Sequence, residues 1–135
     1  MRLPFNGVLL RILMGEDDRH KGVPVYELIV MKARELNMAG ATVCRGIMGF
    51  GANSHLHTTK LLRLSDDLPV VIEIVDTEEN IKKLLPYIDE IMSGGIVTME
   101  RMRILRYMDR KESRVDDRDE EIESLEEFLA GKGKD

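Results

Sequence analysis

The residues best suited to hold a ligand follow an apolar segment in the first half of the chain. Arg45 and a glycine turn, Gly49-Phe50-Gly51, close this segment, and His57-Thr58 come after a short polar stretch. Glycines at a strand exit permit positive φ angles and let a ligand approach the backbone closely. By residue type alone, the triplet indicates either a ligand-binding turn or an ordinary turn.

Two further groups carry the side chains of metal ligands. His55 and His57 would share one face of an extended segment and, with an acidic residue, would bind a divalent metal. Glu16-Asp17-Asp18 fits a cation or ribose site, or a solvated turn that stabilises the start of a helix through its dipole. Neither group has a third ligand of fixed position, so no metal residue is assigned. Cys44 is expected to be a small buried residue, since nothing near it would activate a thiol.

Catalytic signatures are missing from the chain. The sequence has no Walker loop, no HExxH, no GxSxG elbow and no plausible triad, so we predict no catalytic residue and a binding protein, not an enzyme. A small phosphate-processing enzyme using Arg45 or Arg103 ranks last among the alternatives because no general base is evident.

Charge is distributed unevenly along the 135 residues. Residues 1–108 hold 14 acidic and 14 basic side chains, whereas residues 109–135 hold 11 acidic and 6 basic ones, which gives the whole net charge of -5. We therefore predict one domain over residues 1–108 and a charged C-terminal extension over 109–135, partly helical or disordered. The neutral charge of this domain and the low aromatic content of the whole chain, 4%, argue against nucleic acid as a partner. The apolar runs are too short for membrane insertion and no signal-peptide pattern is present, which predicts a cytoplasmic protein.

Apolar periodicity predicts four strands and two helices. Strands are expected at residues 8–14, 41–49, 70–75 and 96–105, with one helix from Pro24 to Gly40 and one between Asp76 or Thr77 and Gly94. Gly40 should end the first helix in the left-handed conformation. In the second helix, Glu79 should complete a capping box and Pro86 should kink or split the helix.

This order of elements predicts a fold and an assembly. Strand, helix, strand, strand, helix, strand is the α+β, ferredoxin-like βαββαβ arrangement, an antiparallel four-stranded sheet with two helices on one face. The first and third strands, which are the most apolar, should lie in its centre. Because these strands are apolar on both parities, the face without helices also needs a cover. The economical cover is a second copy of the same sheet, which predicts a homo-oligomer.

The motifs around these strands resemble those of the PII-like signalling proteins. A GEDD turn follows the first predicted strand, RGIMGFG (residues 45–51) ends the second, and LSDDLPVVIEIVD (residues 64–76) contains the third. The resemblance covers about residues 8–107 and is nearest to the uncharacterised PII-like domain-of-unknown-function group. It implies a homotrimer that senses a small molecule, requires no cofactor and regulates a target protein.

The resemblance also implies where a ligand binds. In PII proteins the GFG turn lies beside a nucleotide pocket between neighbouring subunits, and a glycine-rich loop with arginines of the last strand holds the phosphates. Carried over, the ligand-binding residues are Arg45, Gly49, Phe50, Gly51, His57, Thr58, Gly94, Gly95, Arg101 and Arg103. The glycine loop is shorter here and lacks the basic residue of the PII version, which counts against a triphosphate. Among the adenine nucleotides, AMP, ADP or a cyclic nucleotide is therefore favoured over ATP, because it needs fewer contacts. The alternative for the arginines is pairing with Glu73 and Glu100 across the sheet.

A ligand-responsive loop completes the expectation. Ligand binding is expected to order residues 52–57, which would then contact the target protein. The alternative function is a divalent-metal-binding trimer of the same fold, with His55, His57 and acidic residues as ligands.

Overall fold

A computed structural model describes residues 5–51, 57–58, 67–107 and 131. Residues 8–100 form one compact unit, and the terminal segments 1–7 and 101–135 form another. Nearly all of the predicted C-terminal extension and most of the expected responsive loop lie outside the described residues. Within the described ranges, no helix is long and apolar enough to cross a membrane.

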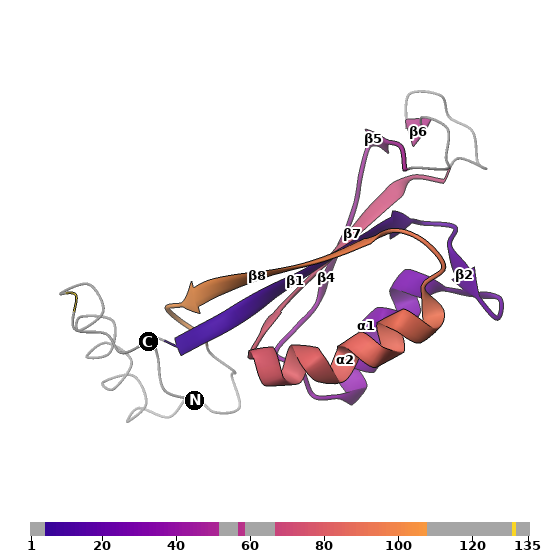
Figure 1. The fold of residues 1–135 in the computed structure, drawn as a ribbon. Helices are drawn as coiled ribbons and strands as arrows, with labels where there is room; N and C mark the ends of the chain where they lie inside the picture. The colour runs from indigo at the N-terminus through magenta and orange to yellow at the C-terminus, as the bar shows by residue number, and fades with distance from the viewer. Residues whose placement is uncertain (1–4, 52–56, 59–66, 108–130, 132–135) are drawn as a thin grey trace. The chain divides into compact units, whose positions relative to one another are not determined.

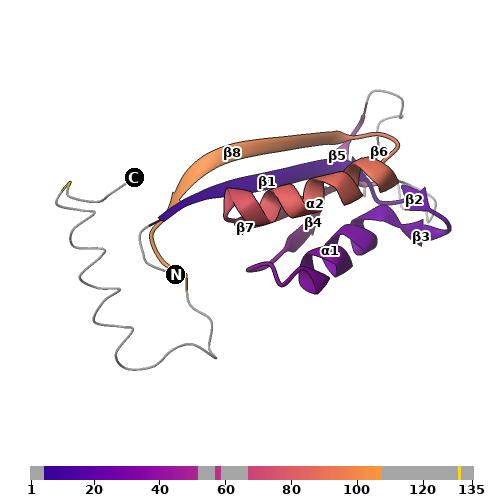
Figure 2. The ribbon, with the colours of Figure 1, turned by 60° about the horizontal axis from the view of Figure 1, so that its bottom comes forward.

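The sheet has four strands in the order β4-β7-β1-β8. β1 (Phe5–Gly15) and β7 (Pro69–Asp76) are central, while β4 (Thr42–Arg45) and β8 (Ile96–Ile104) form the edges. β7 runs antiparallel to both β1 and β4. Helices α1 (Val25–Glu35) and α2 (Glu78–Ile91) cover one face (Figures 1 and 2). The predicted ferredoxin-like α+β fold, with the first and third predicted strands in its centre, is confirmed.

The core lies between this sheet face and the two helices. Alternate residues of the central strands are buried on this face, because successive side chains of a strand point to opposite sides. Leu10, Ile12, Ile72 and Ile74 are 0% exposed and belong to one cluster with Ile29, Ile81 and Leu84 from the helices. The sequence did not determine which parity faces the helices, since both parities of β1 are apolar.

The C-terminal end of α1 differs from the prediction. The left-handed residue is Asn37, with φ +56°, and not Gly40. The N–H of Met38 donates to the carbonyl of Ala33 and the N–H of Asn37 donates to that of Arg34, both at 3.0 Å. These two hydrogen bonds together form a Schellman motif, in which asparagine replaces the more usual glycine.

The start of α2 also differs in detail. Thr77 is the N-cap, and its hydroxyl accepts from the N–H of Asn80 at 3.2 Å, so Glu79 does not occupy the capping-box position. Pro86 lies inside the helix without splitting it. Because Pro86 is on the exposed side, the carbonyl group that loses its helical partner can bond to water.

Two features between the main elements were not predicted. A short hairpin of β2 (Arg19–His20) and β3 (Val23–Pro24) precedes α1, and its turn residues Lys21 and Gly22 have positive φ. The predicted second strand is divided into β4 and β5 (Met48–Gly49), and β5 pairs with β6 (His57–Thr58). The division occurs at Gly46, whose N–H donates to the carbonyl of Pro69 at 2.6 Å.

Candidate functional site at one end of the sheet

The glycines of RGIMGFG pack against the proline that begins β7. A Cβ atom added to Gly46 would lie 2.7 Å from Cγ of Pro69, and one added to Gly49 would lie 2.9 Å from the same atom. Side chains larger than hydrogen therefore do not fit at either position without movement of the proline. This contact joins two motifs that are about 20 residues apart in the sequence and fixes the base of the loop between them.

The small β5–β6 ladder gathers several predicted ligand residues above this base. Gly49 pairs with His57, and Met48 pairs with Thr58. Phe50 is 76% exposed beside them, and Ile47 is equally exposed. The exposed apolar side chains of Ile47 and Phe50 therefore lie next to the paired backbones of Gly49 and His57. Whether these residues bind a ligand stays a prediction.

Arg45 is held by an acidic partner at the end of β4. Its guanidinium donates to Oε1 of Glu16, and the N–H of Glu16 donates to the carbonyl of Leu68 at 2.8 Å. The Arg45 side chain is 61% exposed and that of Glu16 only 21%, so the carboxylate is the more shielded partner. An anion that binds Arg45 must therefore share the guanidinium with Glu16 or displace it.

The acidic turn after β1 makes protein contacts of its own. Asp18 accepts a hydrogen bond from the N–H of Gly15 at 3.1 Å, and the N–H of Asp17 donates to Asp67 at 2.7 Å. A side chain at Gly15 would require the Asp67 carboxylate to move, because a Cβ there would collide with it. These contacts favour the structural interpretation of the turn over a cation or ribose site.

The glycine pair after α2 lies at the same end of the sheet as the Pro69 contact. Gly95 has φ +101°, and a Cβ there would collide with the carbonyl oxygen of Leu13 near the end of β1. Two residues further on, Gly15 pairs with Pro69 of β7. Gly94, in contrast, has open space where a Cβ would stand. The backbone at Gly94 is therefore accessible to a ligand. Within the described parts of the chain, no neighbouring atom would prevent a larger residue from replacing this glycine.

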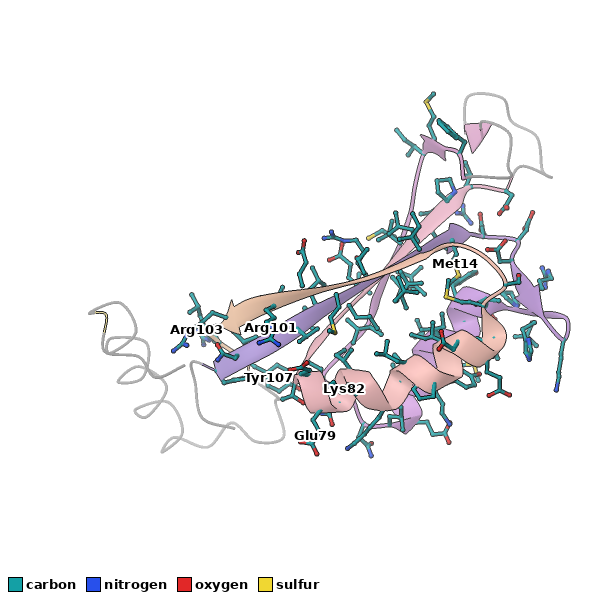
Figure 3. The ribbon with its side chains drawn as sticks, in the orientation of Figure 1. Met14, Glu79, Lys82, Arg101, Arg103 and Tyr107 are labelled. Carbon is teal, nitrogen blue, oxygen red and sulfur yellow. The ribbon has the colours of Figure 1, made fainter. Side chains whose placement is uncertain are left out.

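The arginines of β8 belong to the smaller compact unit. Arg101 and Arg103 lie along the last part of the strand (Figure 3), and Arg103 donates to Asn6 at 3.4 Å. Their participation in one ligand site with the glycines stays a prediction. Glu73 and Glu100 are the acidic partners expected for these arginines as an alternative. Glu73 instead forms an ion pair with Arg11, with 3.7 Å between Nε of Arg11 and Oε1 of Glu73.

The metal hypothesis depends on His55 and His57, which the structure describes only in part. Within the described parts of the chain, no three His, Cys, Asp or Glu side chains come together in a way that could hold an ion. His55 lies outside those parts, so the metal site stays a prediction. Cys44, predicted to be buried, is exposed, because it lies opposite Val71 on the sheet face without helices.

Sequence reasoning missed the two contacts that organise this end of the sheet. These are the Pro69 contact with the two glycines and the pairing of Arg45 with Glu16. The spacing of Gly46 and Gly49 was a signal that something must approach the backbone. Its partner was hidden because a residue about 20 positions later supplies it.

Sequence comparison identifies a family. Residues 7–104 match the sequence model of DUF190, described as Uncharacterized ACR, COG1993. A UPF0166 protein of Aquifex aeolicus (strain VF5) is 39% identical over 99 residues, which cover 72% of this chain and 91% of the relative.

Structure comparison gives PII-like neighbours. CPII of Thiomonas intermedia K12, bound to ADP and bicarbonate, has a TM-score of 0.57 at 17% identity and covers 76% of this chain and 91% of that chain. A putative PII-like signalling protein of Thermus thermophilus has a TM-score of 0.53 at 14% identity, covering 73% of this chain and 89% of that chain. At these identities the likeness concerns the fold, and it confirms the predicted PII-like fold.

Proposed function

We propose, on the premise that this chain belongs to the DUF190 family and has a PII-like fold, that it is a homotrimeric sensor of an adenine nucleotide or a similar small anion. The ligand binds between subunits, beside the glycine turn Gly49–Gly51 and the backbone of Gly94. Its binding changes the loop that follows β5, and this loop contacts a target protein. No catalytic step is part of the proposal.

The packing of Gly46 and Gly49 on Pro69 carries this proposal. It makes the loop base a fixed platform, because the turn cannot move without opening a contact with a central strand. Next to the platform, Gly49 pairs with His57 and the Phe50 side chain is exposed, which supports a ligand site at this turn. The CPII structure, which has the same fold, holds ADP and bicarbonate, and this supports an adenine nucleotide as the first ligand to test.

The helix-free face of the sheet supports the oligomer. Leu13 and Val75 on this face are each 37% exposed in the single chain, and Val71 is half-buried between Leu13 and Cys44. Covering such a face removes apolar surface from water, at roughly 25 cal/mol per Å². Three copies with their sheets turned inward provide that cover and create clefts between subunits.

The proposed response is a shift between two loop states. A ligand shifts such an equilibrium only if it binds one state more tightly than the other. The ion pair between Arg45 and Glu16 offers the difference, because an anion near Arg45 weakens its hold on the acidic turn. The negative charge of the ligand thereby weakens the ion pair at the base of the loop.

Calorimetric titration tests the proposal directly. The purified chain is titrated with AMP, ADP, ATP and cyclic AMP, each with and without bicarbonate. An arginine–phosphate hydrogen bond contributes about 1.5–3 kcal/mol, so Arg101→Ala or Arg103→Ala should weaken nucleotide binding by roughly tenfold to a hundredfold. Lysine should restore little of this loss, since it lacks the planar fork.

A glycine variant tests the backbone approach without disturbing the fold. Gly94→Ala has room in the chain and should leave unfolding unchanged, but it should weaken nucleotide binding if the ligand contacts that backbone. Gly40→Ala, which also has open space, is the matched control. If no nucleotide gives heat and a divalent cation raises the thermal midpoint, the nucleotide proposal fails and the metal-binding alternative replaces it.

A further inference from the structure

The sheet face that carries no helix has an unusual distribution of charge. We call it the open face. Residues directly opposite in antiparallel strands share a face, so the registers of the strand pairs define its members. On the three strands β1, β7 and β4, these members are Leu9, Arg11 and Leu13, then Val71, Glu73 and Val75, then Thr42 and Cys44.

One cation and one anion lie in the middle of this apolar surface. Arg11 and Glu73 are cross-strand partners, and Nε of Arg11 is 3.7 Å from Oε1 of Glu73. The pairs on either side of them are apolar, Leu9 with Val75 and Leu13 with Val71. In the single chain the two charged side chains are 40% and 46% exposed, which leaves them open to further partners.

The charges restrict what can cover the open face. An ion pair at this exposure contributes about 0–1 kcal/mol, so stability of the single chain does not explain it. A purely apolar cover would remove water from both charges, and their attraction to each other at 3.7 Å would repay only part of that desolvation, because an apolar cover adds no hydrogen bond to either group. A uniformly charged cover, such as an acidic segment, would satisfy Arg11 but repel Glu73. The cover must therefore offer an anion and a cation together.

We propose that Arg11 and Glu73 form a charge network between copies of this chain, in which Arg11 of one subunit faces Glu73 of the next. The inference rests on the homo-oligomer of the proposed function and adds the residues that select its arrangement. A second copy is the occupant that fits, because its open face carries the same two charges in the same apolar frame. Around a closed ring the two signs alternate, and each charge gains a second partner when water is excluded.

Charge reversal tests this network. Arg11→Glu makes the open face doubly negative and Glu73→Arg makes it doubly positive. Each single variant should raise the protein concentration for half-assembly by at least about tenfold, since like charges at an interface oppose association strongly. The double variant, Arg11→Glu with Glu73→Arg, should assemble like the wild type. Light scattering over a dilution series gives the oligomer mass, and circular dichroism reports folding.

Mixing separates a network between copies from a pair within one chain. Equal amounts of the two single variants should assemble at a lower total protein concentration than either variant alone, because two of the three contacts in a mixed ring of three join opposite charges. A pair that acts only within one chain gains nothing from mixing. Lys82→Glu is the control, since it reverses a charge in an ion pair of similar length, 3.6 Å, on the outside of α2.

The possible results distinguish the charge network from the homo-oligomer on which it rests. Folded single variants that assemble like the wild type overturn the network and leave the homo-oligomer standing. A folded double variant that does not assemble also overturns it, even if the single variants fail to fold. A wild-type chain that is a monomer at every concentration overturns the homo-oligomer and the network together.

Discussion

Asp76 connects three segments of the chain, and replacing it by asparagine should cost a large part of the stability. It is 3% exposed at the end of β7. Oδ2 accepts from the N–H of Ala39 at 2.8 Å, while Oδ1 accepts from the N–H of Thr77 at 2.7 Å and from the side-chain amide of Asn80 at 2.9 Å. The carboxylate thereby fixes the connection after α1 to the start of α2.

The cost of Asp76→Asn follows from this geometry. An amide has one oxygen, so either Ala39 or the pair Thr77 and Asn80 faces a nitrogen that can only donate. A hydrogen bond to a charged group contributes about 1.5–3 kcal/mol, and a buried donor left without an acceptor costs about 1–3 kcal/mol. The free energy of unfolding should fall by about 3 kcal/mol. For a unit of this size, that lowers the melting temperature by roughly 10–20 °C.

Thermal and urea unfolding at one fixed protein concentration measure the change, since assembly makes the midpoint depend on concentration. Asp89→Asn, the same substitution on the exposed side of α2, should stay within about 0.5 kcal/mol of the wild type. Asn80→Ala removes one of the three hydrogen bonds and should cost about 1 kcal/mol. If Asp76→Asn loses no more stability than Asp89→Asn, the three contacts do not act as described.

Three other perturbations have defined outcomes. Gly95→Ala should lower the unfolding free energy by about 2 kcal/mol or more, because φ is +101° and the new Cβ meets the Leu13 carbonyl, whereas Gly94→Ala should be neutral in thermal unfolding. Val71→Asp should yield a folded chain that no longer assembles in light scattering, because Val71 lies on the open face. Ile72→Asp should unfold the chain, because Ile72 is 0% exposed in the core. Truncation after Met108 should leave the circular dichroism of the folded sheet, and loss of that signal would place the domain boundary further along the chain.

The central strands were predictable because their residues are apolar on both parities. The same property hid the orientation of β1, since Leu9 and Leu10 look alike in the sequence although only Leu10 lies in the core between sheet and helices. The left-handed residue after α1 is Asn37 and not Gly40. The helix ends at Glu35, and the Schellman hydrogen bonds require the left-handed residue two positions later. Glycine has the higher propensity for a left-handed position, but the hydrogen bonds at the end of this helix determine which residue occupies it.

The candidate site was predicted as a set of motifs but not as a geometry. RGIMGFG and LSDDLP each suggested a special backbone, and the structure brings them together through Pro69. A contact between segments so far apart in the sequence leaves no local signal in residue type. For the same reason, the partner of Arg45 was identified only when the acidic turn was seen beside the end of β4.

The Pro69 contact also restricts the order in which substitutions can accumulate in this part of the chain. The shortest distances at both Gly46 and Gly49 end on Cγ of the proline ring, whereas its Cβ stands at 3.6 Å from each, an ordinary contact. Replacing Pro69 by alanine removes Cγ and with it the main obstacle to a Cβ at either glycine. Alanine at Gly49 should therefore be harmful beside proline and nearly neutral beside alanine, so the three positions form one epistatic unit whose first permitted step is at residue 69.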